Sequence, residues 1–241
     1  MKEIDTKIKS KRAILKSISI LGGSSFINIL IGMFKTKVVA VLLGPSGFGL
    51  ISVLNNLQSV ILTVTGLGLT NSGIRQIAYA ASNGDKKSIA VTVRSFMIMV
   101  LLTGIIGLIV MVFGANFLSQ ISFKTKEHTI NIALLGLSIL FTSISNGQLS
   151  VLQGFSKIKD VAKISILGAI NGTVISIPLY YFLGQKGIVP SLILSSLAAF
   201  LTSSWFCHKI KVDQVLIDLK VFKEEAKKFI IFGLPLMLSG F

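Results

Sequence analysis

Charged residues are scarce in this chain of 241 residues. Only 14% of its residues are charged and 52% are hydrophobic, and the mean hydropathy is +0.82. With so few polar side chains, a globule of this length could not cover its surface in water. The composition therefore predicts a membrane protein.

Cysteine and histidine are nearly absent. Cys207 is the single cysteine, which excludes an internal disulfide framework. The two histidines, His128 and His208, lack the thiol or carboxylate neighbours that a metal site needs. The sequence also shows no nucleophile with a base and no phosphate-loop spacing. We therefore expect neither an enzyme nor a bound metal or cofactor.

Carboxylates are missing from every long apolar stretch. The nine acidic residues all lie in the termini or between those stretches: Glu3, Asp5, Asp85, Glu127, Asp160, Asp213, Asp218, Glu224 and Glu225. Carboxylates at membrane depth are the groups that bind coupling ions or positively charged substrates. Their absence counts against an antiporter for cationic drugs.

Basic residues are in excess, and the formal net charge is +15. On a soluble domain this excess would suggest nucleic-acid binding, which needs a basic face with stacking aromatics. Here the charges fall between apolar runs. We therefore expect no nucleic-acid partner.

Six apolar segments are long enough to cross a membrane, which takes about 20 helical residues for a core of about 30 Å. Short linkers with turn residues separate them, such as GPSG at 44–47 and GQKG at 184–187. The sequence predicts an all-α membrane protein whose six spans, within residues 1–208, lie near 17–43, 49–73, 94–117, 130–152, 163–183 and 188–207.

A basic linker over 209–228, expected in the cytoplasm, leads to a seventh apolar run at Phe229. This run has 13 residues up to Phe241, a rise of about 20 Å, which is too short to cross. Its onset, EEAKKFIIFGLPLML, resembles KRAILKSISILGG before and within the first span. We expect 229–241 to be the truncated start of a second lobe that repeats the first.

The basic residues also predict an orientation. With Lys35 and Lys37 set aside, nineteen lysines and arginines fall on the side of the amino terminus and three on the other side. Cytoplasmic segments carry the excess of positive charge. The amino terminus is therefore expected inside the cell.

Lys35 and Lys37 interrupt the first span near its outer end. Counting back seven and eleven residues from Lys35 reaches Asn28 and Ser24, a polar stripe on one helix face. Lys37 shares its face with apolar residues such as Phe34. We interpret Lys35 as facing a protein interior or cavity and Lys37 as reaching the outer headgroups. In the alternative, the helix ends at Phe34 and both lysines are interfacial anchors.

The second span adds amide and hydroxyl groups, beginning with Asn55 and Gln58. Together they could bind a hydroxyl-rich ligand; singly, each is as well explained as a contact between helices, worth about 0.6 kcal/mol. Asn131, Asn146, Gln148, Gln153 and Asn171 are interpreted as such contacts. The candidate substrate-binding residues are Lys35, Asn28, Ser24, Asn55 and Gln58.

Residues 15–90 carry the marks of a known family. A basic residue precedes the turn LGPSGFG, the second span closes on GLG, and the loop with Arg75 follows. In this order the sequence resembles the amino-terminal part of polysaccharide flippases, the O-antigen translocase branch of the multidrug/oligosaccharidyl-lipid/polysaccharide exporter superfamily.

The resemblance implies a transporter of two six-helix lobes around a V-shaped cavity, of which this chain supplies one. It implies a polyprenyl-diphosphate-linked oligosaccharide as substrate, membrane lipid around it, and polysaccharide polymerase and chain-length machinery as partners, in the bacterial inner membrane. Lys35 matches a cationic position that helps related flippases attract anions. Relatives often carry arginine there, which binds phosphate as a bidentate fork rather than as a point charge. A cation antiporter of the same fold and an inactive truncated lobe stay open as alternatives.

Overall fold

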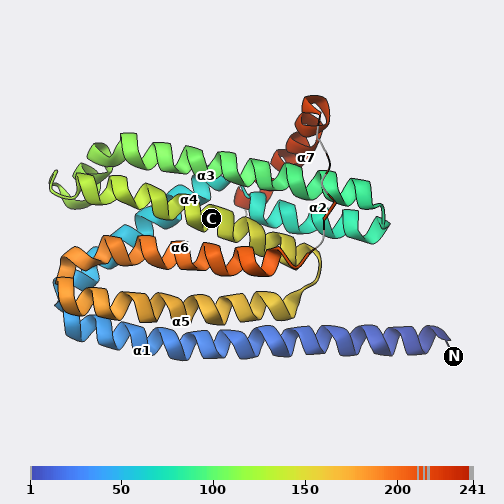
Figure 1. Ribbon diagram of the computed structural model, residues 1–241, viewed down its shortest axis with the longest axis horizontal. Coiled ribbons are helices and arrows are strands. Elements are labelled where there is room, and N and C mark those ends of the chain that lie inside the picture. Colours follow the sequence, from blue (N-terminus) through green and yellow to red (C-terminus); the bar gives the residue numbers. More distant parts are fainter. Residues whose placement is uncertain (1, 211, 214, 216–217, 239–241) are drawn as a thin grey trace.

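The computed structural model describes residues 2–210, 212–213, 215 and 218–238. Within these ranges the chain forms helices and short turns and no strand. Most of the helices lie roughly side by side; the part of α1 after its kink crosses them obliquely, and α7 is tilted away from them (Figure 1). They are α1 (Lys2–Gly66), α2 (Leu69–Asn83), α3 (Lys86–Phe123), α4 (Thr129–Gly154), α5 (Ile158–Leu183), η1 (Gly184–Gly187, a 3₁₀ helix), α6 (Ile188–Cys207) and α7 (Leu219–Leu238).

Among the residues that the structure describes, four stretches of helix are long and apolar enough to span a membrane: Ser17–Gly66, Lys86–Phe123, Thr129–Gly154 and Ile158–Cys207. The first and last contain 50 residues each, or about 75 Å of helix. That length allows two crossings of a core of about 30 Å. The first stretch is interrupted at Gly44, and the last is interrupted at Gly184–Gly187. The expected fold class, an all-α membrane protein with six transmembrane helices, is confirmed.

The GPSG segment is a kink and not the four-residue loop that its turn residues predict. Gly44 alone is non-helical, with φ 66°, and the helix resumes with Pro45. Glycine accepts this φ, and proline is tolerated in the first turn of a helix because its missing N–H would have no partner there. The kink divides α1 into a first arm, residues 2–43, and a second arm, residues 45–66. The first arm packs on α5, and the second crosses behind α6 and α4 toward α3 (Figure 1).

The predicted second span runs too far along the chain. Its helix ends at Gly66, and Leu67 and Gly68 both have positive φ, 48° and 66°. The glycines on either side of Leu67 permit this reversal. Residues 69–73 instead begin α2, an amphipathic helix whose buried residues are Leu69, Ser72, Gly73, Ile77 and Ala80.

The predicted linker over 209–228 is also partly wrong, because α7 begins at Leu219. Phe229 is fully buried against Phe96 of α3, with ring centroids 5.5 Å apart. The charged residues from Lys220 to Lys228 therefore belong to the first turns of a helix that packs through its apolar residues. The last part of the expected seventh span, residues 239–241, lies outside the described residues.

Two other helices begin before their predicted spans, α3 at Lys86 and α5 at Ile158. At the start of α3, the Asp85 carboxylate accepts hydrogen bonds from the backbone N–H groups of Lys87 and Ser88, at 3.1 and 3.2 Å. This N-cap stabilises turns outside the hydrocarbon core. Hydropathy alone therefore underestimates the length of α3 and α5.

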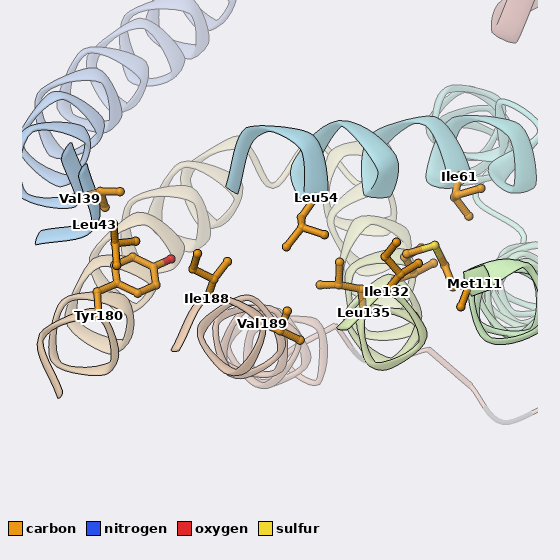
Figure 2. Packing of buried hydrophobic residues seen from close by; sticks show 12 residues of the cluster. Val39, Leu43, Leu54, Ile61, Met111, Ile132, Leu135, Tyr180, Ile188 and Val189 are labelled. Atoms are coloured by element: carbon orange, nitrogen blue, oxygen red, sulfur yellow. The ribbon is translucent and has the colours of Figure 1, made fainter. Parts of the chain in front are cut away.

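The largest buried cluster holds both arms of α1 on the bundle (Figure 2). Val39 and Leu43 of the first arm lie near Tyr180 of α5 and Ile188 of α6 (Figure 2). Leu54, which is completely buried, contributes from the second arm. This packing fixes the angle between the arms and so positions the polar residues that they carry.

Candidate functional site

A polar groove of about 670 Å³ lies between the second arm of α1, the start of α2, α4 and α6. Eleven of its fifteen lining residues are polar and uncharged, and no lining residue within the described chain is charged. Amides and hydroxyls both donate and accept hydrogen bonds, which suits a ligand rich in hydroxyl groups. The polar residues are Asn55, Gln58, Ser59, Thr63, Thr70, Asn71, Ser138, Thr142, Asn146, Ser195 and Ser196.

Helical spacing brings the α4 residues to the groove. Ser138, Thr142 and Asn146 are four residues apart and so share one helix face. This spacing is visible in the sequence and could have indicated the site, whereas taken singly Asn146 is interpreted as a contact between helices. In the structure its side chain is exposed in the groove.

Asn55 and Gln58 line the groove from the second arm. Gln58 Nε2 donates to Thr142 Oγ1 across the groove at 3.3 Å. The Asn55 side chain makes no hydrogen bond to the part of the chain that the structure describes, and it is exposed. These two predicted residues therefore lie on one surface, one of them bonded and the other free to bind.

Lys35 is not a lining residue of the groove, but it lies near one, on the side where the first arm packs on α5. A side-chain carbon placed at Gly172 of α5 would lie 3.8 Å from Lys35 Nζ and 3.9 Å from Ser195 Oγ. Ser195 lines the groove, and its Oγ is buried without a hydrogen-bond partner among the described residues. The ammonium group of Lys35 and the groove residue Ser195 thus both lie close to Gly172.

The charge of Lys35 has no carboxylate partner among the described residues, where the single ion pair joins Lys228 and Glu225. Lys35 is half-buried and Lys37 is exposed. The first arm is helical through both lysines, so the helix does not end at Phe34 as the alternative expects. A half-buried ammonium group without a counter-charge favours an anion from outside the chain.

Ser24 and Asn28, the remaining predicted residues, lie away from the groove. Asn28 Nδ2 donates to Ser165 Oγ of α5 at 3.2 Å, and Asn28 Oδ1 is buried without a partner in the described chain. The Ser24 hydroxyl donates to the carbonyl of Leu21 in its own helix at 2.8 Å. Ser24 and Asn28, which the sequence predicts to share a face with Lys35, are thus engaged within the protein: Asn28 contacts α5, and Ser24 bonds to its own helix.

A family model described as a polysaccharide biosynthesis protein matches residues 14–241. A comparison with curated proteins finds no match. Among solved structures, a MOP superfamily transporter from Pyrococcus furiosus is 21% identical, with a TM-score of 0.71 over 93% of this chain and 52% of that chain. MOP denotes the multidrug/oligosaccharidyl-lipid/polysaccharide exporter superfamily.

Two transporters of the MATE type have a similar fold. One, a multidrug resistance MATE family transporter in an outward-facing conformation, is 22% identical, with a TM-score of 0.71 over 93% of this chain and 52% of that chain. The other, a MATE in a bent conformation, is 18% identical, with a TM-score of 0.73 over 95% and 53%. The chain thus spans about half the length of these transporters and has the fold of one of their lobes.

Proposed function

Because the chain belongs to the polysaccharide biosynthesis protein family, we propose that it forms one lobe of a flippase for an undecaprenyl-diphosphate-linked oligosaccharide. The flippase moves this unit from the inner to the outer leaflet of the bacterial inner membrane. The unit serves O-antigen or a similar surface polysaccharide, and polymerase and chain-length machinery consume it after export.

The observation that carries the proposal is an uncharged groove with one unpaired cation, Lys35, near its lining residue Ser195. Sugar hydroxyls would bond to groups such as Asn55 and Asn146 in the groove. The diphosphate would be attracted by Lys35, whose ammonium group lies beside the Gly172 gap. The polyprenyl tail would stay in the lipid, while a second lobe rocks against this one to alternate access.

The groove lining also argues against export of organic cations, for which a carboxylate would be expected at membrane depth. The likeness to MATE transporters concerns the fold and not the pocket. The Pyrococcus furiosus transporter is described as having a binding pocket of reverse polarity that suggests a different function. Side chains in the pocket therefore distinguish functions within this fold.

The direction of transport follows from the proposed orientation. The amino terminus and the turns after α2 and α4 lie at one end of the bundle, and residues 124–128 and η1 at the other (Figure 1). The first end carries the larger number of basic residues and is placed in the cytoplasm. In intact cells an impermeant thiol reagent should leave Ser82→Cys unlabelled when Cys207 is replaced; labelling would reverse the orientation.

The experiment for this function is export by the full transporter, of which this chain supplies one lobe, in a strain that lacks its own O-antigen flippase. The wild type should restore surface polysaccharide, which is seen on a gel. Lys35→Ala should not restore it, because the diphosphate is no longer attracted by the ammonium group. Lys37→Ala is the matched control and should export like the wild type, since its amine is exposed. Membrane abundance is measured for both. Wild-type export by Lys35→Ala at normal abundance would remove the proposed role of this cation.

A further inference from the structure

A second pocket, of about 430 Å³, lies where α7 packs against α2 and α3. We call it the α2–α7 pocket. It shares no lining residue with the groove. Unlike the groove it contains charged side chains: Arg75 from α2, and Glu225 and Lys228 from α7. It is therefore a separate site with a different chemistry.

The charge of Arg75 is left uncompensated in this pocket. Lys228 Nζ lies 2.6 Å from Glu225 Oε1, so these two charges neutralise each other. Arg75 has no ion pair or hydrogen bond within the part of the chain that the structure describes; its guanidinium carbon lies 5.1 Å from the centre of the Phe232 ring. A guanidinium group that lies over an aromatic ring is fixed in position by this contact. Its N–H groups point outward in the plane of the guanidinium and can still donate hydrogen bonds to a ligand.

A hydroxyl group in the same pocket lacks a partner. Threonines in helices often donate to the carbonyl four residues earlier, as Thr65 and Thr173 do here at 2.8 Å. Thr92 lines the pocket, is only 6% exposed, and makes no hydrogen bond to the described residues. Its hydroxyl oxygen is not fully buried, so it is open to the pocket and free to bond to a ligand or water there. Ser88, one turn earlier, adds a second hydroxyl.

We propose that the α2–α7 pocket binds a phosphate group. The Arg75 guanidinium would donate two parallel hydrogen bonds to phosphate oxygens, a geometry in which arginine excels. The hydroxyls of Thr92 and Ser88 would donate to the remaining oxygens. Glu225 would not repel the ligand strongly because Lys228 already neutralises it.

The rim of the pocket accepts either a free phosphate or the phosphate of a membrane lipid. Tyr79 and Phe232, which line the pocket, are 70% and 44% exposed and offer apolar surface for an acyl chain. Because the pocket walls belong to α2, α3 and α7, a bound phosphate stabilises the packing of α7 on the bundle.

The test is thermal unfolding of the full protein in a neutral detergent, followed by circular dichroism. The probes are inorganic phosphate, dihexanoyl phosphatidic acid and, as the control without phosphate, dihexanoylglycerol, all at matched ionic strength. The unfolding midpoint should rise saturably with phosphatidic acid and not with dihexanoylglycerol. A rise with inorganic phosphate as well identifies free phosphate as sufficient; a rise with phosphatidic acid alone identifies a lipid headgroup.

Variants show whether this pocket is responsible. Arg75→Gln should weaken the apparent affinity at least about tenfold, since a charge-assisted bidentate contact is lost. Thr92→Val keeps nearly the same shape but removes the hydroxyl, so it should weaken the apparent affinity by a smaller but measurable factor. If Arg75→Gln does not fold, the response of Thr92→Val tests the proposal instead. Lys87→Gln, exposed and outside the pocket, is the control. No response to either phosphate probe, or equal responses of the wild type, Arg75→Gln and Thr92→Val, would overturn the proposal.

Discussion

Two polar regions of α4 have opposite surroundings. In the seam between α4 and α6, Gln148 Nε2 donates to Ser204 Oγ at 2.8 Å, and Ser203 Oγ donates to Ser145 Oγ at 3.1 Å. Gln148 is 8% exposed, Ser145 5% and Ser203 not at all. Asn146, between these residues in sequence, points into the groove, where it is exposed and has no partner within the described chain.

The difference shows that the helix face, and not the residue type, separates structural polar groups from binding groups. Buried polar groups inside a membrane protein need partners within the protein, and the seam supplies them. Groove residues are left for water or a ligand. Substitutions in the groove should therefore affect transport, and substitutions in the seam should affect stability.

The largest effect is expected from closing the gap at the groove edge. Gly172→Leu puts a branched side chain into this gap, where its first carbon alone would lie 3.8 Å from Lys35 Nζ and 3.9 Å from Ser195 Oγ. It should abolish export in the flippase-deficient strain because the ammonium group is displaced. The matched control is Gly168→Leu, one turn earlier, where a side-chain carbon would meet no atom within 4 Å. Equal export by the two variants at equal membrane abundance would contradict the proposed path from Lys35 to the groove.

A smaller loss of transport is expected from the groove amides. Asn55→Ala combined with Asn146→Ala removes two side chains that have no bonds to the described chain, so export should fall roughly tenfold. The unfolding midpoint of the purified protein should stay unchanged. Ser24→Ala is the control with normal export, since its hydroxyl only bonds to the Leu21 carbonyl. A lower unfolding midpoint in the double variant would show that these amides stabilise the fold and are not free to bind a ligand.

The smallest effect on transport is expected in the seam. Gln148→Ala removes contacts to Ser203 and Ser204. Contacts of this kind in membranes are worth about 0.6 kcal/mol on average, so unfolding should become easier by about 1–2 kcal/mol. Export per folded molecule, measured in the same strain, should be preserved. Loss of export at normal stability would show that the seam takes part in binding.

Much of the fold could be predicted because hydropathy alone locates the hydrocarbon-spanning helices. The boundaries could not, because they depend on backbone geometry at single residues. Gly44 bends a helix that the GPSG motif is expected to end, and Leu67 and Gly68 stop one that hydropathy continues. Asp85 starts α3 earlier through its cap.

The candidate site was only partly predictable from sequence. Lys35, Asn55 and Gln58 stand out because charges and amides are rare in apolar spans. In the structure Asn55 and Gln58 line the groove, and Lys35 lies outside its lining, near Gly172. Ser195 gives no such signal, because serine is common in these helices and only packing shows that its hydroxyl lacks a partner among the described residues. The face of Lys35 also contains Asn28, but the bundle turns that residue toward α5.

The most direct test of the central claim is transport by the full transporter in proteoliposomes. A labelled undecaprenyl-diphosphate-linked oligosaccharide is placed in both leaflets, and its exposure to an impermeant enzyme outside is followed with time. The proposal predicts faster exchange between leaflets with the wild type than with Lys35→Ala, and no uptake of an organic cation. Uptake of the cation without exchange of the lipid-linked saccharide would contradict it.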